Sequence, residues 1–181
     1  PHMAKLENER MDLLRPGFYA NVSKNWVVPG QTQKMYLSNV RNLQTLKITF
    51  SRLNIEGETR LSPYNDDDYA ALKKKVVPGE PAFSRTLTYG DQPPYKQLKD
   101  TIEIPSLPTG VYLLEYAVDG NVLKNKSLLY YVSNINVLYE QQPQKTIRYV
   151  VVNNSTGQPI PNASLRLTFD ERYKAKRKVK N

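Results

Sequence analysis

A run of closely spaced strand patterns between Leu107 and Tyr139 constrains this chain more than any other feature. The patterns occupy residues 107–116, 128–132 and 135–139, and a further set begins at Lys145. The first part is typical of the closing hairpin of a β-sandwich, and a new set of strands then starts with almost no linker. We therefore predict two adjoining β domains, with Val132-Ser133-Asn134 as the junction. Rows of such modules are more typical of scaffolds, adhesins and traps than of soluble enzymes.

Short strand patterns also recur at steady spacing before the junction. In the pattern over residues 45–53, Leu46, Ile48 and Phe50 alternate with polar residues, as in a strand with one face on a core. Asp119-Gly120-Asn121 is a tight hairpin turn. We predict an all-β, seven-stranded antiparallel sandwich over residues 16–132. Its expected strands are 18–22, 34–38, 45–53, 82–89, 101–104, 111–118 and 122–132.

One segment interrupts the strand patterns and predicts one short helix. Residues 64–75 begin with Asp66-Asp67-Asp68 and end with three lysines, a charge order that suits the helix dipole. We expect this helix to cross between the two sheets or to cap an open end. The aspartates are consecutive, whereas a calcium loop has ligands at alternate positions, a glycine turn and a distal glutamate. We therefore interpret them as a helix N-terminus rather than a metal site.

The N-terminal residues are expected to lie outside the sandwich. Pro1-His2-Met3 resembles a remnant of tag cleavage, and residues 4–15 form a polar lead-in segment with a weak helical pattern that Pro16-Gly17 ends. Outside that remnant the chain has no histidine, and it has no cysteine. Histidine acid–base catalysis, histidine metal ligation and thiol chemistry are therefore excluded.

The net charge of +9 does not by itself indicate a nucleic-acid partner. Six of the basic residues are gathered in residues 170–181, and the others are scattered along strands and loops. Charge of this kind supports only non-specific binding, so we interpret it as a solvated surface and expect no nucleic-acid partner. No apolar stretch approaches the ~20 residues of a membrane-spanning helix.

Residues 133–181 predict the start of a second sandwich. Strand patterns at 135–139, 146–153 and 163–169 surround a loop over residues 154–159. Three strands cannot close a sandwich, and an unfinished sheet leaves edges and an apolar face uncovered. We therefore expect a truncated module.

Motifs that carry chemistry are scarce, and we predict no catalytic, cofactor-binding or metal-binding residue. The carboxylate pairs Asp91 with Asp100 and Glu56 with Glu58 have no predicted apolar pocket around them. Trp26 is expected to fill a core position, with an exposed contact residue as the alternative. Four tyrosines form either a cross-strand aromatic ladder, which we favour, or a platform for sugars or peptides: Tyr112, Tyr116, Tyr130 and Tyr131.

Three segments resemble the N-terminal macroglobulin-type (MG) domains of bacterial alpha-2-macroglobulins, especially the large Bacteroides-type proteins. One is Val28-Pro29-Gly30-Gln31 with the strands around it, up to Phe50-Ser51-Arg52-Leu53. Another is residues 102–112, which are similar to the family's I-x-I-P-x-L-x-x-G-x-Y sequence. The last is residues 131–135 followed by 150–163, where Thr156-Gly157-Gln158-Pro159 resembles the turn that opens the next domain. Together these segments cover residues ~16 to 170.

The resemblance implies an immunoglobulin- or fibronectin-like macroglobulin sandwich and a function. Proteins of this family are broad-spectrum endopeptidase inhibitors that enclose a protease after it cuts a bait region, and many carry a Cys-Gly-Glu-Gln thioester. This chain has no cysteine, so no active residue of the family transfers to it. The implied role is a non-catalytic scaffold domain of a periplasmic or outer-membrane-anchored protease trap. Its partners would be neighbouring domains and, through the parent protein, proteases. The alternative is a cell-surface adhesin or glycan-binding sandwich.

Overall fold

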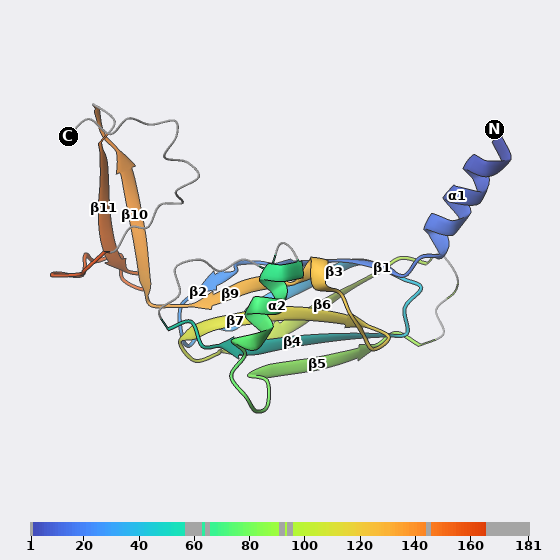
Figure 1. Cartoon of the computed structure of the whole chain (residues 1–181), viewed down its shortest axis with the longest axis horizontal. Helices are drawn as coiled ribbons and strands as arrows, with labels where there is room; N and C mark the ends of the chain where they lie inside the picture. The colour runs from blue at the N-terminus through green and yellow to red at the C-terminus, as the bar shows by residue number, and fades with distance from the viewer. Residues whose placement is uncertain are drawn as a thin grey trace. The chain divides into compact units, whose positions relative to one another are not determined.

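The computed structural model describes residues 2–56, 63, 66–90, 93, 96–143 and 146–165. The chain divides into two compact units, residues 1–134 and 135–181, whereas the boundary expected from the sequence lay between residues 132 and 133. Each unit is described by itself below, and Figure 1 labels the helices and strands.

The first unit contains two β-sheets. The smaller sheet has the order β1 (Gly17–Val22), β3 (Gln33–Arg41), β6 (Leu98–Ile104). The larger has the order β2 (Trp26–Val27), β9 (Leu128–Val132), β7 (Gly110–Val118), β4 (Thr45–Leu53), β5 (Phe83–Thr88), and β8 (Asn121–Val122) pairs with β7. The described part of the protein is mostly β, as predicted, and each of the seven predicted strands overlaps one of the seven longer strands described in this unit.

Two details of the predicted sheet are wrong. The pairing of β2 with β9 is parallel, so the larger sheet is mixed rather than antiparallel. The predicted strand over residues 122–132 is also interrupted by a single 3-10 turn, η1 (Lys124–Lys126). On β7, Ala117 pairs with Val122 and Leu114 pairs with Leu128. Two residues separate the paired positions on β7 but five separate Val122 from Leu128, so the chain between β8 and β9 has three extra residues. These residues form η1, in which the Lys126 and Ser127 amides donate to the carbonyls of Leu123 and Lys124.

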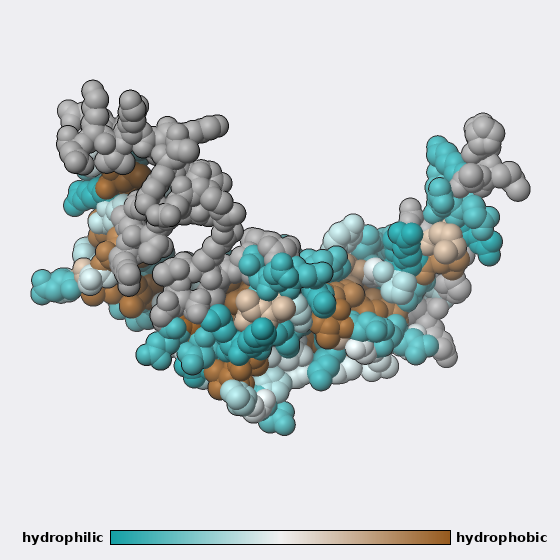
Figure 2. All heavy atoms as spheres, viewed as in Figure 1, coloured by the Kyte–Doolittle hydropathy of each residue, from teal (hydrophilic) through white to brown (hydrophobic). Residues whose placement is uncertain are grey.

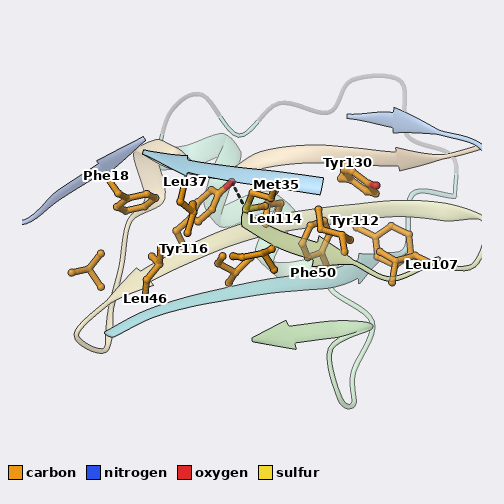
Figure 3. Packing of buried hydrophobic residues seen from close by; sticks show 14 of the residues in the cluster. Phe18, Met35, Leu37, Leu46, Phe50, Leu107, Tyr112, Leu114, Tyr116 and Tyr130 are labelled. Carbon is orange, nitrogen blue, oxygen red and sulfur yellow. Dashed lines mark hydrogen bonds between the residues drawn. The ribbon is translucent and has the colours of Figure 1, made fainter. Parts of the chain in front are cut away.

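Side chains from the inner faces of both sheets form the main core, which Figure 3 shows from close by. Phe50 on β4 meets Tyr130 on β9 edge-to-face, with ring centroids 5.1 Å apart. The Tyr116 hydroxyl lies 3.9 Å from the Met35 sulfur of the facing sheet. Aromatic rings therefore supply much of the buried area that holds the two sheets together.

A tyrosine corner explains the spacing of residues 107–112. The Tyr112 hydroxyl donates a 2.6 Å hydrogen bond to the Pro108 carbonyl, which fixes the path of the chain into β7. Arg52 donates to the Thr109 carbonyl at 3.2 Å and packs over Gly110, where a Cβ would lie only 3.2 Å from the Arg52 Nε. The tyrosine thus fixes this corner by its hydrogen bond, and a side chain at Gly110 would have to displace Arg52 slightly.

The predicted hairpin turn at Asp119-Gly120 is confirmed. Both residues have positive φ angles, 48° and 83°, as a two-residue type I′ turn requires. The Asp119 Oδ1 atom also accepts hydrogen bonds from the backbone amides of Gln44 and Thr45, at 3.1 and 2.7 Å. This carboxylate therefore ties the β7–β8 hairpin to the β3–β4 connection.

The helices differ from the prediction in number and in place. The lead-in segment forms α1 (His2–Leu14), which ends just before Pro16-Gly17, and the predicted helix is α2 (Asp66–Lys74). Tyr69 and Leu72 of α2 pack on the outer face of the larger sheet, so α2 neither crosses between the sheets nor caps an open end (Figure 1). The reason is a second set of apolar residues on that face: Leu53, Val111, Leu113 and Leu129.

The second unit is described as an antiparallel hairpin of β10 (Ile135–Gln141) and β11 (Ile147–Asn153), followed by a turn. The Asn153 side chain accepts from the amides of Ser155 and Thr156, and the Asn153 amide donates to the Gln158 carbonyl. Residues 163–165 of the third predicted strand are not in a strand, and its remaining residues, 166–169, lie outside the described part.

Candidate functional site

The tyrosines proposed as a binding platform are mostly in the core. Tyr112, Tyr116 and Tyr130 are 0–2% exposed. Tyr112 and Tyr130 lie directly opposite each other on β7 and β9, as a cross-strand ladder requires, and the platform interpretation is wrong for these three buried tyrosines. Burial raises the pKa of Tyr130 to about 12, and it also raises the pKa of Tyr116. These hydroxyls therefore stay protonated at neutral pH.

Trp26 is exposed, so the expectation that it fills a core position is wrong. It remains 44% exposed on β2, and its ring stacks on that of Tyr131, with centroids 5.3 Å apart and planes 26° apart. The parallel pairing of β2 with β9 places the two residues directly opposite each other. Two neighbouring rings are thereby held in a fixed orientation at a sheet edge, an arrangement that can stack on another flat apolar surface.

The outer face of the larger sheet holds a buried carboxylate that the sequence did not reveal. Glu115 on β7 is 6% exposed and accepts a 2.5 Å hydrogen bond from the Tyr69 hydroxyl and a 3.0 Å ion-paired hydrogen bond from the Lys73 amino group. Both donors come from α2. The pKa of Tyr69 is raised, first by burial and then by the hydrogen bond and the negative charge of Glu115.

This Glu115 cluster is suited to anchoring rather than to catalysis. The raised pKa of Tyr69 keeps its hydroxyl protonated, so Tyr69 donates a hydrogen bond and is not an activated base or nucleophile. The carboxylate in turn fixes α2 in register on the sheet. The available signal was the position of Glu115, an isolated charge inside the apolar run of residues 111–118.

A groove of about 860 Å³ lies next to the Glu115 cluster. It is bordered by the connection from Val76 to Ala82 and by the C-terminal end of α2. Residues of β4, β5 and β7 in the larger sheet contribute to its lining. Its hydroxyl and amino groups can form hydrogen bonds with a polar ligand. The polar residues from β4 and β5 that line it are Thr45, Lys47, Thr49, Ser51, Arg52 and Thr86.

A second hollow of about 480 Å³ lies beside β1 and the β7–β8 hairpin. Lys126 lines it, donates to the Phe18 carbonyl at 3.2 Å and lies over the rings of Phe18 and Tyr19, 4.9 and 5.8 Å from their centroids. Arg41 and Asp119 also line it. The positive charge of Lys126 is thus already engaged by the protein itself.

Each of the two carboxylate pairs considered from the sequence has one member outside the described residues. Asp100 accepts hydrogen bonds from the Tyr89 hydroxyl and the Thr101 amide, whereas Asp91 and Glu58 lie outside the description. Asp66, Asp67 and Asp68 occupy the first turn of α2, as expected for a helix N-terminus. Across the described ranges no group of three metal-binding side chains is gathered, and no helix there has the length and apolar character needed to span a membrane.

Comparison with protein-family models and with curated protein sequences finds no match to this chain. The geometry of the described residues therefore carries the functional argument. It offers an exposed tryptophan stacked on a partly buried tyrosine, an anchored helix beside a polar groove, and a sandwich followed in sequence by a second β unit.

Proposed function

We propose that this chain is a non-catalytic scaffold piece of an alpha-2-macroglobulin-like endopeptidase inhibitor, or protease trap. The observation that carries the proposal is the direct succession of two β units: β9 ends at Val132 and β10 begins at Ile135. A protein made of modules joined in this way can hold its parts in a defined row, which a trap needs in order to enclose a protease.

The strand arrangement supports an immunoglobulin- or fibronectin-like macroglobulin sandwich. In such folds a tyrosine near the start of the sixth main strand bonds back to the backbone a few residues upstream. Tyr112 occupies that position here, at the start of β7 and after the connection from β6. The I-x-I-P-x-L-x-x-G-x-Y sequence that resembles the family is thus the sequence of this corner.

The proposed location is periplasmic or outer-membrane-anchored, with neighbouring domains of the parent protein as direct partners. The chain would act through its shape and not through chemistry. Its clearly buried hydroxyl groups on Tyr69, Tyr116 and Tyr130 have raised pKa values, so they serve as neutral structural groups.

A substrate-size experiment tests the trap function. The full-length parent protein is mixed with a protease, and digestion of a large protein substrate and of a small peptide substrate is followed in parallel. A trap blocks digestion of the large substrate and spares the small one, because the enclosed protease keeps its active site. Equal loss of both activities, or loss of neither, would contradict the proposal.

A glycan-binding or adhesin module is the second candidate, and the exposed Trp26 ring, stacked on the partly buried Tyr131, favours it. Binding of the chain to a glycan array, abolished by Trp26→Ala, would support it. Tyr139→Ala is a matched control, because Tyr139 is also an exposed aromatic residue but lies in the second unit. A Tyr112→Ala variant would be unsuitable here, because Tyr112 is buried in the core and its loss would disturb the fold rather than a binding surface.

A further inference from the structure

The edges of the two sheets in the first unit differ in how open they are to another strand. Among the described strands, β5 (Figure 1) pairs only with β4, through six consecutive residue pairs without a register shift. The pairings of β3 with β1 and with β6 each contain a register shift, and β6 carries Lys99, Asp100 and Glu103. Bulges and charges of this kind discourage strand pairing, and β2, the other edge of the larger sheet, has only two residues. β5 is therefore the least protected edge among the described strands of the first unit.

The two sides of β5 have different chemistry. Phe83 and Leu87 are half-buried and pack against the main core, and the Phe83 ring lies 5.8 Å from that of Phe50. Ser84, Thr86 and Thr88 are exposed on the opposite side. An added strand would therefore meet apolar positions toward the core and hydroxyl groups on the outside.

Arg85 supplies the one charge on this strand. It is exposed and lies between Phe83 and Leu87 on the core side, and no described residue forms an ion pair with it. On the other side, Lys47 of β4 is paired with Thr86 of β5 and is also exposed. A strand added at this edge would thus lie next to Arg85 on one side of the sheet, with Lys47 one strand farther away on the other side.

We propose that the free edge of β5 binds an extended, acidic segment of a partner protein by β-strand addition. Backbone hydrogen bonds would provide the general affinity and alternate side chains the specificity. The register with Phe83, Arg85 and Leu87 selects an apolar residue, an acidic residue and an apolar residue at every second position. A second copy of this chain is a poorer occupant, because each copy has a net charge of +9.

Fluorescence anisotropy with labelled peptides tests this assignment on the intact chain. The probe is a peptide of sequence TVTETVT, and the comparison peptides replace its glutamate with lysine or carry N-methyl groups on alternate backbone amides. We expect the glutamate peptide to bind at least about tenfold more tightly than the lysine peptide, and N-methylation to abolish binding. Arg85→Glu should reverse the preference between the two charged peptides.

Two further variants keep the result interpretable. Arg85→Gln removes the charge with little change in shape, so it replaces Arg85→Glu if the reversal impairs folding, and it should bring the two charged peptides to similar affinities. Lys99→Glu alters the edge strand β6 and should leave the preference unchanged. Absence of binding at millimolar peptide, binding insensitive to N-methylation, or an unchanged preference in both Arg85 variants would overturn the proposal. Self-association of the chain that Arg85→Glu abolishes would also overturn it, in favour of a second copy.

Discussion

Each unit of this protein has two tyrosines that face each other across antiparallel strands, yet the two pairs have different environments. Tyr112 and Tyr130 on β7 and β9 are 0% and 1% exposed, whereas Tyr139 and Tyr149 on β10 and β11 are 75% and 36% exposed. Strand pairing is the same in both cases. The difference is a second sheet, which covers the first pair and has no counterpart among the described residues of the second unit.

A hairpin and a sandwich contribute differently to folding stability. A two-stranded hairpin satisfies backbone hydrogen bonds but is marginally stable by itself in water, and a packed second layer supplies most of the apolar burial. Figure 2 shows hydrophobic side chains at the surface of the hairpin, among which Ile135, Leu138 and Ile147 are exposed. The first unit should therefore carry nearly all of the folding stability of the chain.

The largest expected effect comes from truncating one tyrosine in each unit. Tyr112→Ala removes a buried ring and its bond to Pro108, and should lower the free energy of unfolding by about 3–5 kcal/mol. Tyr139→Ala should change it by less than about 0.5 kcal/mol, because that ring is exposed. Urea unfolding followed by circular dichroism measures both. Equal losses of stability in the two variants would contradict the different roles assigned to the buried and the exposed tyrosine pairs.

Alkaline pH should destabilise the first unit through its buried tyrosines. Burial raises the pKa of Tyr130 from 10.0 to about 12. The contribution of its neutral hydroxyl to folding stability is therefore fully present below pH 10 and is lost as the pH rises toward 12. A rise of that size corresponds to about 3 kcal/mol. Urea midpoints measured from pH 8 to 12 should fall above pH 10. Tyr130→Phe should make the decline shallower, and an identical decline in this variant would refute the assignment.

The Glu115 cluster should contribute somewhat less to the free energy of unfolding than the buried core tyrosines. Tyr69→Phe removes a hydrogen bond to a buried carboxylate and should cost about 1.5–3 kcal/mol in the free energy of unfolding. Tyr89→Phe is the control: its hydroxyl donates to Asp100 over 3.2 Å at a half-exposed position, so its cost should be smaller. If the two variants were equally stable, Glu115 would not be the anchor of α2.

The smallest effect on the free energy of unfolding is expected at Trp26, which is exposed. Trp26→Ala should cost only about 1 kcal/mol, since it removes one stacked aromatic contact and leaves the core intact. Trp26 is also the single tryptophan of the chain, so its fluorescence in the folded state should be readily quenched by acrylamide. A loss of 3 kcal/mol or more, or a shielded emission, would instead indicate a core position.

Periodicity predicted the strands well because it reports which residues share a face. The alternation around Leu46, Ile48 and Phe50 and the turn at Asp119-Gly120 located β4 and the β7–β8 hairpin directly. Periodicity does not report what covers a face. In residues 111–118 both faces are buried, since α2 covers one of them, and the sequence alone did not assign α2 to that place.

The surface features were harder to predict for the same reason. The exposure of Trp26 follows from its position on a two-residue edge strand that pairs parallel to β9, and such a short strand leaves no alternation to read. Glu115 became a candidate only when Tyr69 and Lys73, more than 40 residues away in sequence, were seen to contact it. The tyrosine corner, by contrast, is local, and its residues were already visible as a motif.

Hydrogen–deuterium exchange on the intact chain tests most directly the claim that this protein provides one self-sufficient sandwich and one dependent hairpin. Amides of β4 and β7 should exchange only through global unfolding of the first unit, whereas those of β10 and β11 should exchange orders of magnitude faster through local opening. Equal protection of the two units, lost together in denaturant, would contradict the account.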